Sequence, residues 1–411
     1  MRKGLLLLLV FGWSWFYLPG QVIGYGPIEM PRDDKIEIPF EYKNDLIIIN
    51  VIFNRIFPLR FIFDTGAEYT ILTRKEITDL LEVNYRRKFT LYGADLSTEL
   101  VAYLAQGINL EISNLRLPNR NVLVLEEDYF SFDKFSGIDI HGIIGADVFR
   151  RYVVEIDYTR ERIIFYHRED FKEPGKKFKS YPVEFHRSRP YITVPVKSAN
   201  DSIVQTKLLM DSGSSLPLIL YPTTSSVLEI PDKVVPGQLG LGLGGFLEGV
   251  VGRVQEIDIA GTTLPDVVTS FQDLGAILDS SALNNRNGIL GNQSMQHFHV
   301  ILDYVKQELY LAPNSKKIPE FKFDRSGLFV IASGKYLNEF QVASVVQGSP
   351  ADEAGLQKGD LLVRINWIPC SLMSLGNIQR KFKKRVGKTF KIVFERDGKR
   401  YRTLLELEEL I

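Results

Sequence analysis

Two segments of the sequence place an aspartate in the same local setting. Residues 61–67 read Phe-Ile-Phe-Asp-Thr-Gly-Ala, and residues 208–214 read Leu-Leu-Met-Asp-Ser-Gly-Ser. Each aspartate, Asp64 or Asp211, follows an apolar run that is typical of a buried strand, and the glycine two positions later allows a tight turn. Two carboxylates that meet on such turns can hold one proton between them, which suits general acid–base chemistry on a water molecule.

The sequence around these segments repeats as well. Asp211 follows Asp64 by 147 positions. The segment Gly-Ile-Leu-Gly at 288–291 follows the similar segment Gly-Ile-Ile-Gly at 142–145 by 146 positions. Chance matches would not keep so constant a spacing, so we infer two copies of one unit of about 130 residues.

Both copies, expected at residues 36–170 and 181–313, are rich in the residue types that favour strands. Strands of the first copy are predicted at 46–53, 60–63, 122–125 and 162–166. Only short helices are predicted, at 74–81, 146–151 and 292–297. A stretch with proline, glycine and four lysines, residues 171–180, is typical of a linker. These patterns predict a mainly β fold.

The two Asp-Thr/Ser-Gly segments are each followed by an apolar-apolar-Gly element, Ile-Ile-Gly at 143–145 and Ile-Leu-Gly at 289–291. With them, residues 36–313 resemble aspartic proteases of the retropepsin/pepsin type that carry both lobes in one polypeptide. The resemblance implies a two-lobed β fold and hydrolysis of peptide bonds by Asp64 and Asp211, with no metal or organic cofactor. The residues that would support the two active-site turns are Thr65, Gly66, Ser212, Gly213 and Ser214.

One Asp-Thr/Ser-Gly segment alone would not establish this chemistry, because the same residues are common in plain turns. Two copies in matched context favour catalysis, and a degenerate protease kept as a binding module is the remaining alternative for this fold. The copies differ where Ala67 corresponds to Ser214. We expect the Ser214 hydroxyl to hydrogen-bond a carboxylate, which would make Asp211 the more readily ionised member of the pair.

Flaps over the cleft are expected in both copies. Tyr92 and Gly93 are the candidates in the first copy, where Tyr92 would either cover the substrate or pack within the lobe. In the second copy the candidates are Gly244 and Gly245, at the end of the glycine-rich segment 240–245. A phosphate-binding loop would need a following Lys-Ser/Thr pair and a helix, and both are missing from this segment. A flexible turn or flap is therefore favoured.

The third unit, residues 323–411, has a different pattern. It carries Ser-Gly-Leu-Phe at 326–329, Gly-Ser-Pro-Ala at 348–351, Ala-Gly-Leu at 354–356 and Gly-Asp-Leu at 359–361. With these segments it resembles a PDZ domain, a small α+β domain with a partly open β-barrel. The resemblance implies that a peptide adds to a sheet edge. The peptide carboxylate would meet the backbone amides of Gly327, Leu328 and Phe329. The alternative is a unit that binds no peptide or docks on the protease lobes.

The N-terminal residues predict export. Arg2 and Lys3 precede an apolar run, which is typical of a secretory signal, and we assign the signal to residues 1–24. We therefore expect a periplasmic or extracellular protein, anchored in a membrane only if the segment is retained. Cys370 is the only cysteine, so no intramolecular disulfide can form, and we expect its side chain to be buried.

Charge and histidine content argue against two other classes. The 50 basic and 50 acidic residues cancel, so the overall charge gives no reason to expect a nucleic-acid partner. His297 and His299 would share one face of a strand. No acidic or cysteine ligands are spaced to complete a metal site with them, so structural roles are favoured and no metal is expected. His141 is also expected to be structural.

The sequence as a whole favours an aspartic endopeptidase that acts on peptide or protein substrates. Its PDZ-like unit would bind a peptide ligand and so recruit or regulate substrates. Because both aspartates lie in one chain, we expect a monomer. The alternative from a different functional class is a non-catalytic peptide-binding or scaffold protein built on the same fold.

Overall fold

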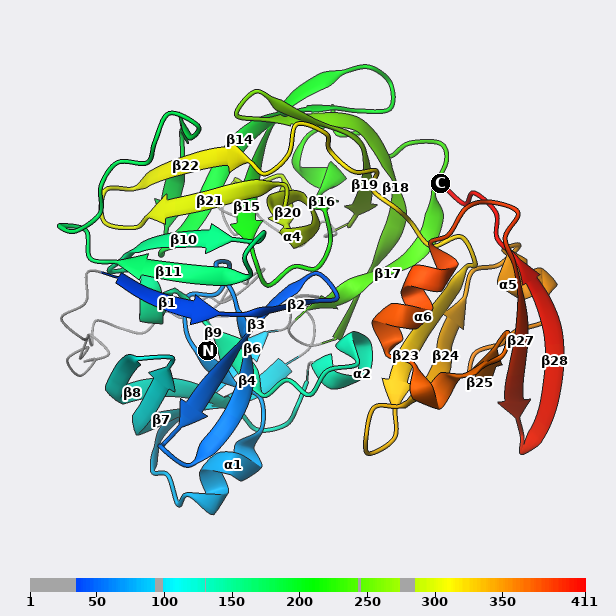
Figure 1. The fold of residues 1–411 in the computed structure, drawn as a ribbon, viewed down its shortest axis with the longest axis horizontal. Coiled ribbons are helices and arrows are strands. Elements are labelled where there is room, and N and C mark those ends of the chain that lie inside the picture. The colour runs from blue at the N-terminus through cyan, green and yellow to red at the C-terminus, as the bar shows by residue number, and fades with distance from the viewer. Residues whose placement is uncertain (1–34, 93–98, 130, 243–244, 274–284) are drawn as a thin grey trace, which may run out of the picture.

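The computed structural model describes residues 35–411 except 93–98, 130, 243–244 and 274–284. These residues form four β-sheets (Figure 1). Two eight-stranded sheets build two lobes, one six-stranded sheet joins the lobes, and a second six-stranded sheet belongs to a C-terminal unit. The mainly β fold class is therefore confirmed. Within the described ranges, no helix is long and apolar enough to cross a membrane.

Lobe one is built on a sheet with the strand order β2-β3-β4-β9-β5-β8-β7-β6. Its strands are β2 (Glu41–Lys43), β3 (Leu46–Phe53), β4 (Phe57–Phe63), β5 (Ile71–Leu72), β6 (Tyr85–Tyr92), β7 (Glu99–Ile112), β8 (Leu115–Leu125) and β9 (Gly142–Ile144). Its helices are α1 (Lys75–Leu80), α2 (Phe132–Ser136) and α3 (Ala146–Phe149). Buried and more exposed residues largely alternate along β7, as expected for a strand with one face on the core.

Lobe two has the equivalent strand order β13-β14-β15-β20-β16-β19-β18-β17. Its strands are β13 (Glu184–His186), β14 (Arg189–Lys197), β15 (Ile203–Asp211), β16 (Leu218–Leu220), β17 (Val235–Gly242), β18 (Gly245–Ile259), β19 (Thr262–Phe271) and β20 (Gly288–Gly291). Its helices are the 3-10 helix η1 (Pro222–Thr224) and α4 (Asn292–Met295). In lobe one β4 pairs in parallel with β9, and in lobe two β15 pairs in parallel with β20. The repeat in the sequence thus corresponds to a repeat in the fold.

The six-stranded sheet β1-β11-β10-β21-β22-β12 holds the two lobes together. Its central pairing is antiparallel, between β10 of lobe one and β21 of lobe two. One large apolar cluster contains residues of both lobes, so the lobes share a core. The strands are β1 (Lys35–Pro39), β10 (Val153–Asp157), β11 (Arg162–Tyr166), β12 (Lys179–Tyr181), β21 (Phe298–Asp303) and β22 (Glu308–Pro313).

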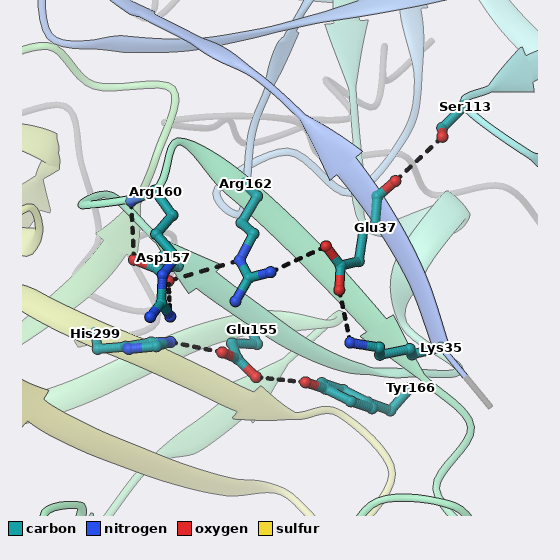
Figure 2. Close-up of polar contacts among 9 residues, drawn as sticks. All are labelled: Lys35, Glu37, Ser113, Glu155, Asp157, Arg160, Arg162, Tyr166 and His299. Carbon is teal, nitrogen blue, oxygen red and sulfur yellow. Dashed lines mark hydrogen bonds and ion pairs between the residues drawn. The ribbon is translucent and has the colours of Figure 1, made fainter.

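Polar contacts cross this interlobe sheet (Figure 2). His299 Nε2 on β21 lies 2.7 Å from Glu155 Oε1 on β10, and the Tyr166 hydroxyl donates to Glu155 Oε2 at 2.7 Å. His297 precedes β21, and its ring meets the ring of Phe321 edge-on with centroids 5.5 Å apart. Both histidines therefore have structural contacts. No cluster of three or more His, Cys, Asp or Glu residues suited to a metal ion occurs in the part of the chain that the structure describes.

The C-terminal unit has its own sheet, β23-β24-β25-β27-β28, with β26 paired to β25. It also has its own apolar cluster, which includes the buried Cys370. Strand β23 lies at one edge of the sheet, and a turn at Asp397 joins β27 to β28. The strands are β23 (Leu328–Ser333), β24 (Glu339–Val345), β25 (Leu361–Ile365), β26 (Ile368–Pro369), β27 (Thr389–Arg396) and β28 (Lys399–Glu406). The helices are α5 (Pro350–Glu353), the 3-10 helix η2 (Cys370–Leu372) and α6 (Leu375–Phe382).

Candidate active site

The two candidate catalytic turns are hydrogen-bonded to each other across the lobe interface. Thr65 Oγ1 donates to the carbonyl of Met210 at 2.8 Å and accepts from the N–H of Ser212 at 3.0 Å. Ser212 Oγ donates to the carbonyl of Phe63 at 2.8 Å and accepts from the N–H of Thr65 at 2.9 Å. Both hydroxyls are buried, and each is satisfied as donor and acceptor. The four bonds fix the two turns in a symmetrical arrangement.

The turn glycines allow the two carboxylates to approach. A Cβ atom on Gly66 would lie only 2.6 Å from Cγ of Asp211, and a Cβ atom on Gly213 would overlap the carboxylate of Asp64. Any side chain at either position would therefore collide with the aspartate of the other lobe. The structure thus brings Asp64 and Asp211 together, with exposed fractions of only 1% and 4%.

Backbone amides hold each carboxylate in place. Asp64 Oδ1 accepts from the N–H groups of Gly66 at 2.7 Å and Ala67 at 3.1 Å, and Asp211 Oδ1 accepts from the N–H of Gly213 at 2.8 Å. The other oxygen of Asp64, Oδ2, is buried and has no hydrogen-bond partner among the described residues. A buried polar atom of this kind calls for a partner, such as a proton or a water molecule.

The two aspartates do not ionise independently. Burial raises the pKa of Asp64 well above its usual value, and the neighbouring Asp211 carboxylate raises it further. Burial also raises the pKa of Asp211, but the neighbouring Asp64 carboxyl opposes this rise, as does the positive charge of Arg286. Like charges at such close range disfavour double ionisation, so the pair keeps one proton in common. The nearby charge of Arg286 favours ionisation of Asp211, and the two carboxyls titrate as a unit.

The Ser214 hydroxyl is not the cause of this asymmetry, contrary to the sequence-based expectation. The backbone N–H of Ser214, rather than its hydroxyl, acts on the Asp211 carboxylate. A Cβ atom on Gly291 would lie 2.8 Å from Ser214 Oγ, which places the hydroxyl beside strand β20. The prediction was wrong because the local motif does not reveal which way this side chain turns.

The Gly-containing elements set the position of the turns. In lobe one the N–H of Asp64 donates to the carbonyl of Ile144 at 3.1 Å, at the end of β9. A Cβ atom on Gly145 would lie 2.5 Å from the backbone of Tyr69, so the chain passes too close here for any side chain. In lobe two, Asp211 lies opposite Gly291 in the parallel pairing of β15 with β20.

Two long hairpins, β6–β7 and β17–β18, stand at equivalent places in the two lobes. Tyr92 is the last residue of β6 and pairs with Glu99, and Gly245 is the first residue of β18. These two flap candidates therefore lie where their hairpins turn. The other two, Gly93 and Gly244, lie outside the described residues.

A buried arginine near the aspartates was missed from the sequence. Arg286 is 2% exposed, and its Nη2 lies 3.5 Å from the hydroxyl of Tyr221. Its Nε has no hydrogen-bond partner among the described residues. Lobe one has the apolar Ile140 at the matching position of the repeat. A charged residue just before an apolar, buried strand is the signal that could have revealed it.

Two of the three backbone amides expected to bind a peptide carboxylate in the C-terminal unit already have partners. The N–H of Gly327 donates to Asp324 Oδ1 at 2.8 Å, and the N–H of Leu328 donates to Ser326 Oγ at 3.0 Å. The third residue, Phe329, faces lobe one, as described below. The Asp324 carboxylate thus accepts a hydrogen bond that the sequence-based prediction assigned to the carboxylate of a bound peptide.

Comparison with known families agrees with this architecture. Residues 49–148 match the family described as aspartyl protease, and residues 341–396 match the family described as PDZ domain. The chain contains an aspartyl protease domain and a PDZ domain. The first match includes Asp64 and ends beyond Gly145, whereas Asp211 lies outside both matches. No curated protein matches the chain.

Proposed function

We propose that this protein is an aspartic endopeptidase in which Asp64 and Asp211 activate a water molecule between them. The observation that carries the proposal is the symmetrical pair of turns, which buries two carboxylates against each other and leaves Asp64 Oδ2 without a partner. Such a pair provides one acid and one base at the same pH. The fold without this pair would suggest only a binding module.

The charge of Arg286 suggests a role for each aspartate, because it favours the ionised form of Asp211. Asp211 takes a proton from the water molecule, whose oxygen attacks the peptide carbonyl carbon. Asp64, which holds the shared proton, donates it to the carbonyl oxygen. The tetrahedral intermediate then collapses with cleavage of the C–N bond and transfer of a proton to the leaving amine. No covalent bond to the enzyme forms.

The remaining assignments extend this proposal to the whole chain. Residues 1–24 serve as an export signal, and the mature protein acts as a monomer in the periplasm or outside the cell. The hairpins β6–β7 and β17–β18 cover an extended peptide, and the PDZ domain regulates access to it. The hairpin pairing supports the flap assignment, and the core that the two lobes share supports a monomer.

Hydrolysis of a mixed peptide library tests the proposal. The wild-type chain is assayed from about pH 3 to about pH 8, a range that spans the raised pKa of an aspartate pair. Asp64→Asn and Asp211→Asn are expected to abolish cleavage, and a statine-type transition-state mimic is expected to block the wild type. Asp397→Asn, at an exposed turn of the PDZ domain, is the matched control and retains full activity. Cleavage that survives in either active-site variant refutes the proposal.

A further inference from the structure

Helix α2 of lobe one contacts the PDZ domain at its edge strand β23 (Figure 1). The ring of Phe135 on α2 lies 6.1 Å from the ring of Phe329 on β23. Gly137, directly after the helix, fits between β23 and α6. A Cβ atom there would lie 2.8 Å from Cβ of Leu375 and 3.8 Å from Cβ of Ala332. The α2 segment therefore enters the space between the edge strand and α6.

This space is where the PDZ resemblance predicts that an extended peptide would add. In the described sheet, β23 pairs on one side only, with β24, so its other side can accept a ligand strand. The carboxylate end of such a site is closed by Asp324, which accepts hydrogen bonds from the N–H groups of Ser326 and Gly327. The chain thus fills both parts of the expected ligand site with its own residues.

The same helix also packs beside the candidate active site. Phe132 of α2 packs against an apolar cluster that contains Ala67, next to the Asp64 turn, together with Leu100 and Ala102 of the hairpin strand β7. It also packs against a second cluster that contains Ile138, on the path from α2 to β9. Phe132 of α2 therefore contacts the apolar cluster next to the Asp64 turn, while Phe135 contacts the PDZ domain.

Helix α2 has little stability of its own. It spans five residues, has no side-chain hydrogen bond at its N-cap Ser131, and is flanked by backbone in the left-handed region at Ser131 (φ 46°) and Gly137 (φ 64°). Helices this short do not persist in water without packing. The Asn44 side chain adds to this packing, since its amide donates to the carbonyl of Ser136. The shape of the segment therefore depends on the surfaces that hold it.

Contacts with lobe two also hold the PDZ domain in position. Phe321, in the connector before the PDZ domain, and Ile411 belong to the core cluster that the two lobes share. Arg253 Nη1 of lobe two donates to the carbonyl of Phe321 at 3.1 Å. The α2 contact is thus a second attachment, to lobe one, of a domain already held by lobe two.

We propose that the groove between β23 and α6 is the docking site of the α2 segment, through which the PDZ domain holds the lobe-one wall of the cleft in its binding-competent position. Phe135 and Phe329 are positioning residues in this device and do not touch the reacting atoms. The expected effect on hydrolysis rests on the proposed function, whereas the docking does not.

Hydrogen exchange of the backbone amides, followed by mass spectrometry on the full chain, tests the docking. Phe329→Ala and Phe135→Ala each remove one ring of the contact. Both are expected to accelerate exchange in residues 131–141 about tenfold, because local opening follows the loss of buried apolar contact. Trp367→Ala also removes a large aromatic ring from the PDZ domain, but from an 84% exposed position, and leaves exchange unchanged. The double variant Phe135→Ala/Phe329→Ala exchanges no faster than the more affected single variant, since both changes break one contact.

The kinetic readout separates positioning from catalysis. Both single variants raise KM for a library peptide about tenfold with little change in kcat, because the cleft wall and not the aspartates is altered. Unchanged exchange in 131–141 in both variants overturns the docking. Faster exchange with unchanged KM overturns its role in substrate binding. The wild type could cleave no peptide while hydrogen exchange in residues 131–141 still responds as expected. In that case the proposed function fails and the docking stands. If Phe329→Ala unfolds the PDZ domain, Phe135→Ala, which lies outside that domain, decides the result.

Discussion

At the residue scale, one charge breaks the near-symmetry of the two turns. Thr65 and Ser212 exchange equivalent hydrogen bonds, and each aspartate accepts from the amides of its own turn. Arg286 has an apolar counterpart in lobe one, and its charge favours the ionised form of Asp211. We infer that this residue, rather than the Ser214 hydroxyl, decides which aspartate acts as the base.

Replacement of the buried charge gives a pH prediction. In Arg286→Met the pKa of Asp211 rises, because the positive charge that favours the ionised form is gone, so the acid limb of kcat/KM moves to higher pH. Arg286→Lys keeps a positive charge and moves the limb less. The other groups near this guanidinium, Tyr191, Tyr221 and Arg189, are unchanged in both variants. An acid limb at the wild-type position in Arg286→Met would show that this charge does not tune the pair.

The hydroxyl of Thr65 gives a stability prediction. Thr65→Val removes the partner of the Met210 carbonyl and of the Ser212 N–H, both buried in the interface. Each orphaned group costs about 1–3 kcal/mol, so the free energy of unfolding falls by about 2–6 kcal/mol. Thr65→Ser keeps the hydroxyl and is expected to lose less than half as much. Equilibrium denaturation measures both, and equal losses in the two variants would show that the hydroxyl does not hold the turns.

At the element scale, the strand that carries each aspartate is positioned by a second strand from later in the same copy. Strand β9 lies between β4 and β5, and its Gly142-Ile-Ile-Gly145 segment leaves no room for side chains at its ends. The same holds for β20 in lobe two, where a Cβ atom on Gly291 would lie 2.8 Å from Ser214 Oγ. The glycines of these elements are therefore packing requirements for the active-site geometry.

Alanine at one of these glycines tests the requirement. In Gly145→Ala the new Cβ atom would collide with the backbone of Tyr69, which cannot rotate away, so we expect a loss of about 3 kcal/mol or more in unfolding free energy. Gly175→Ala in the linker is the matched control, because nothing lies within 4 Å of its added Cβ atom. The control is expected to change stability by less than about 0.5 kcal/mol. Equal melting temperatures for the two variants would contradict this account.

Strands and the Gly-containing elements were predictable from the sequence where a local pattern of residues determines them. Strands β3 and β11 have the bounds expected from their runs of apolar and β-branched residues, and the paired Gly elements revealed the repeat. Contacts between distant segments were not predictable. The position of α2 against β23 joins residues about 190 positions apart, and the Asp324 carboxylate occupies the PDZ amides through a loop geometry that the motif does not encode. The prediction for the Ser214 hydroxyl was wrong for the same reason, because the motif does not encode the orientation of its side chain.

At the scale of the whole molecule, the chain is held together by a core that crosses the lobe boundary and reaches the PDZ domain. The interlobe sheet and the large apolar cluster join the lobes, and Phe321 links that cluster to the connector before the PDZ domain. The PDZ domain contacts lobe one through α2 as well. The PDZ domain is therefore attached to both lobes.

Truncation of the Phe321 side chain tests whether this residue attaches the PDZ domain to the shared core of the lobes. Phe321→Ala removes a ring that is 4% exposed, and the cavity left behind costs about 3–5 kcal/mol of unfolding free energy. We also expect faster hydrogen exchange at the lobe-two face of the PDZ domain. Lys316→Ala, an exposed change in the same connector, affects neither quantity. A loss below about 1 kcal/mol in Phe321→Ala would show that this residue does not link the domains.

The central claim is that Asp64 and Asp211 form one catalytic unit with a shared proton. The most direct test compares kcat for Asp64→Asn, Asp211→Asn and the double variant on a peptide that the wild type cleaves. Residues that act as a unit have non-additive effects, so each single change is expected to lower kcat about a thousandfold or more, and the double change no further. A single variant that keeps wild-type kcat, or losses that add in the double variant, would contradict the account.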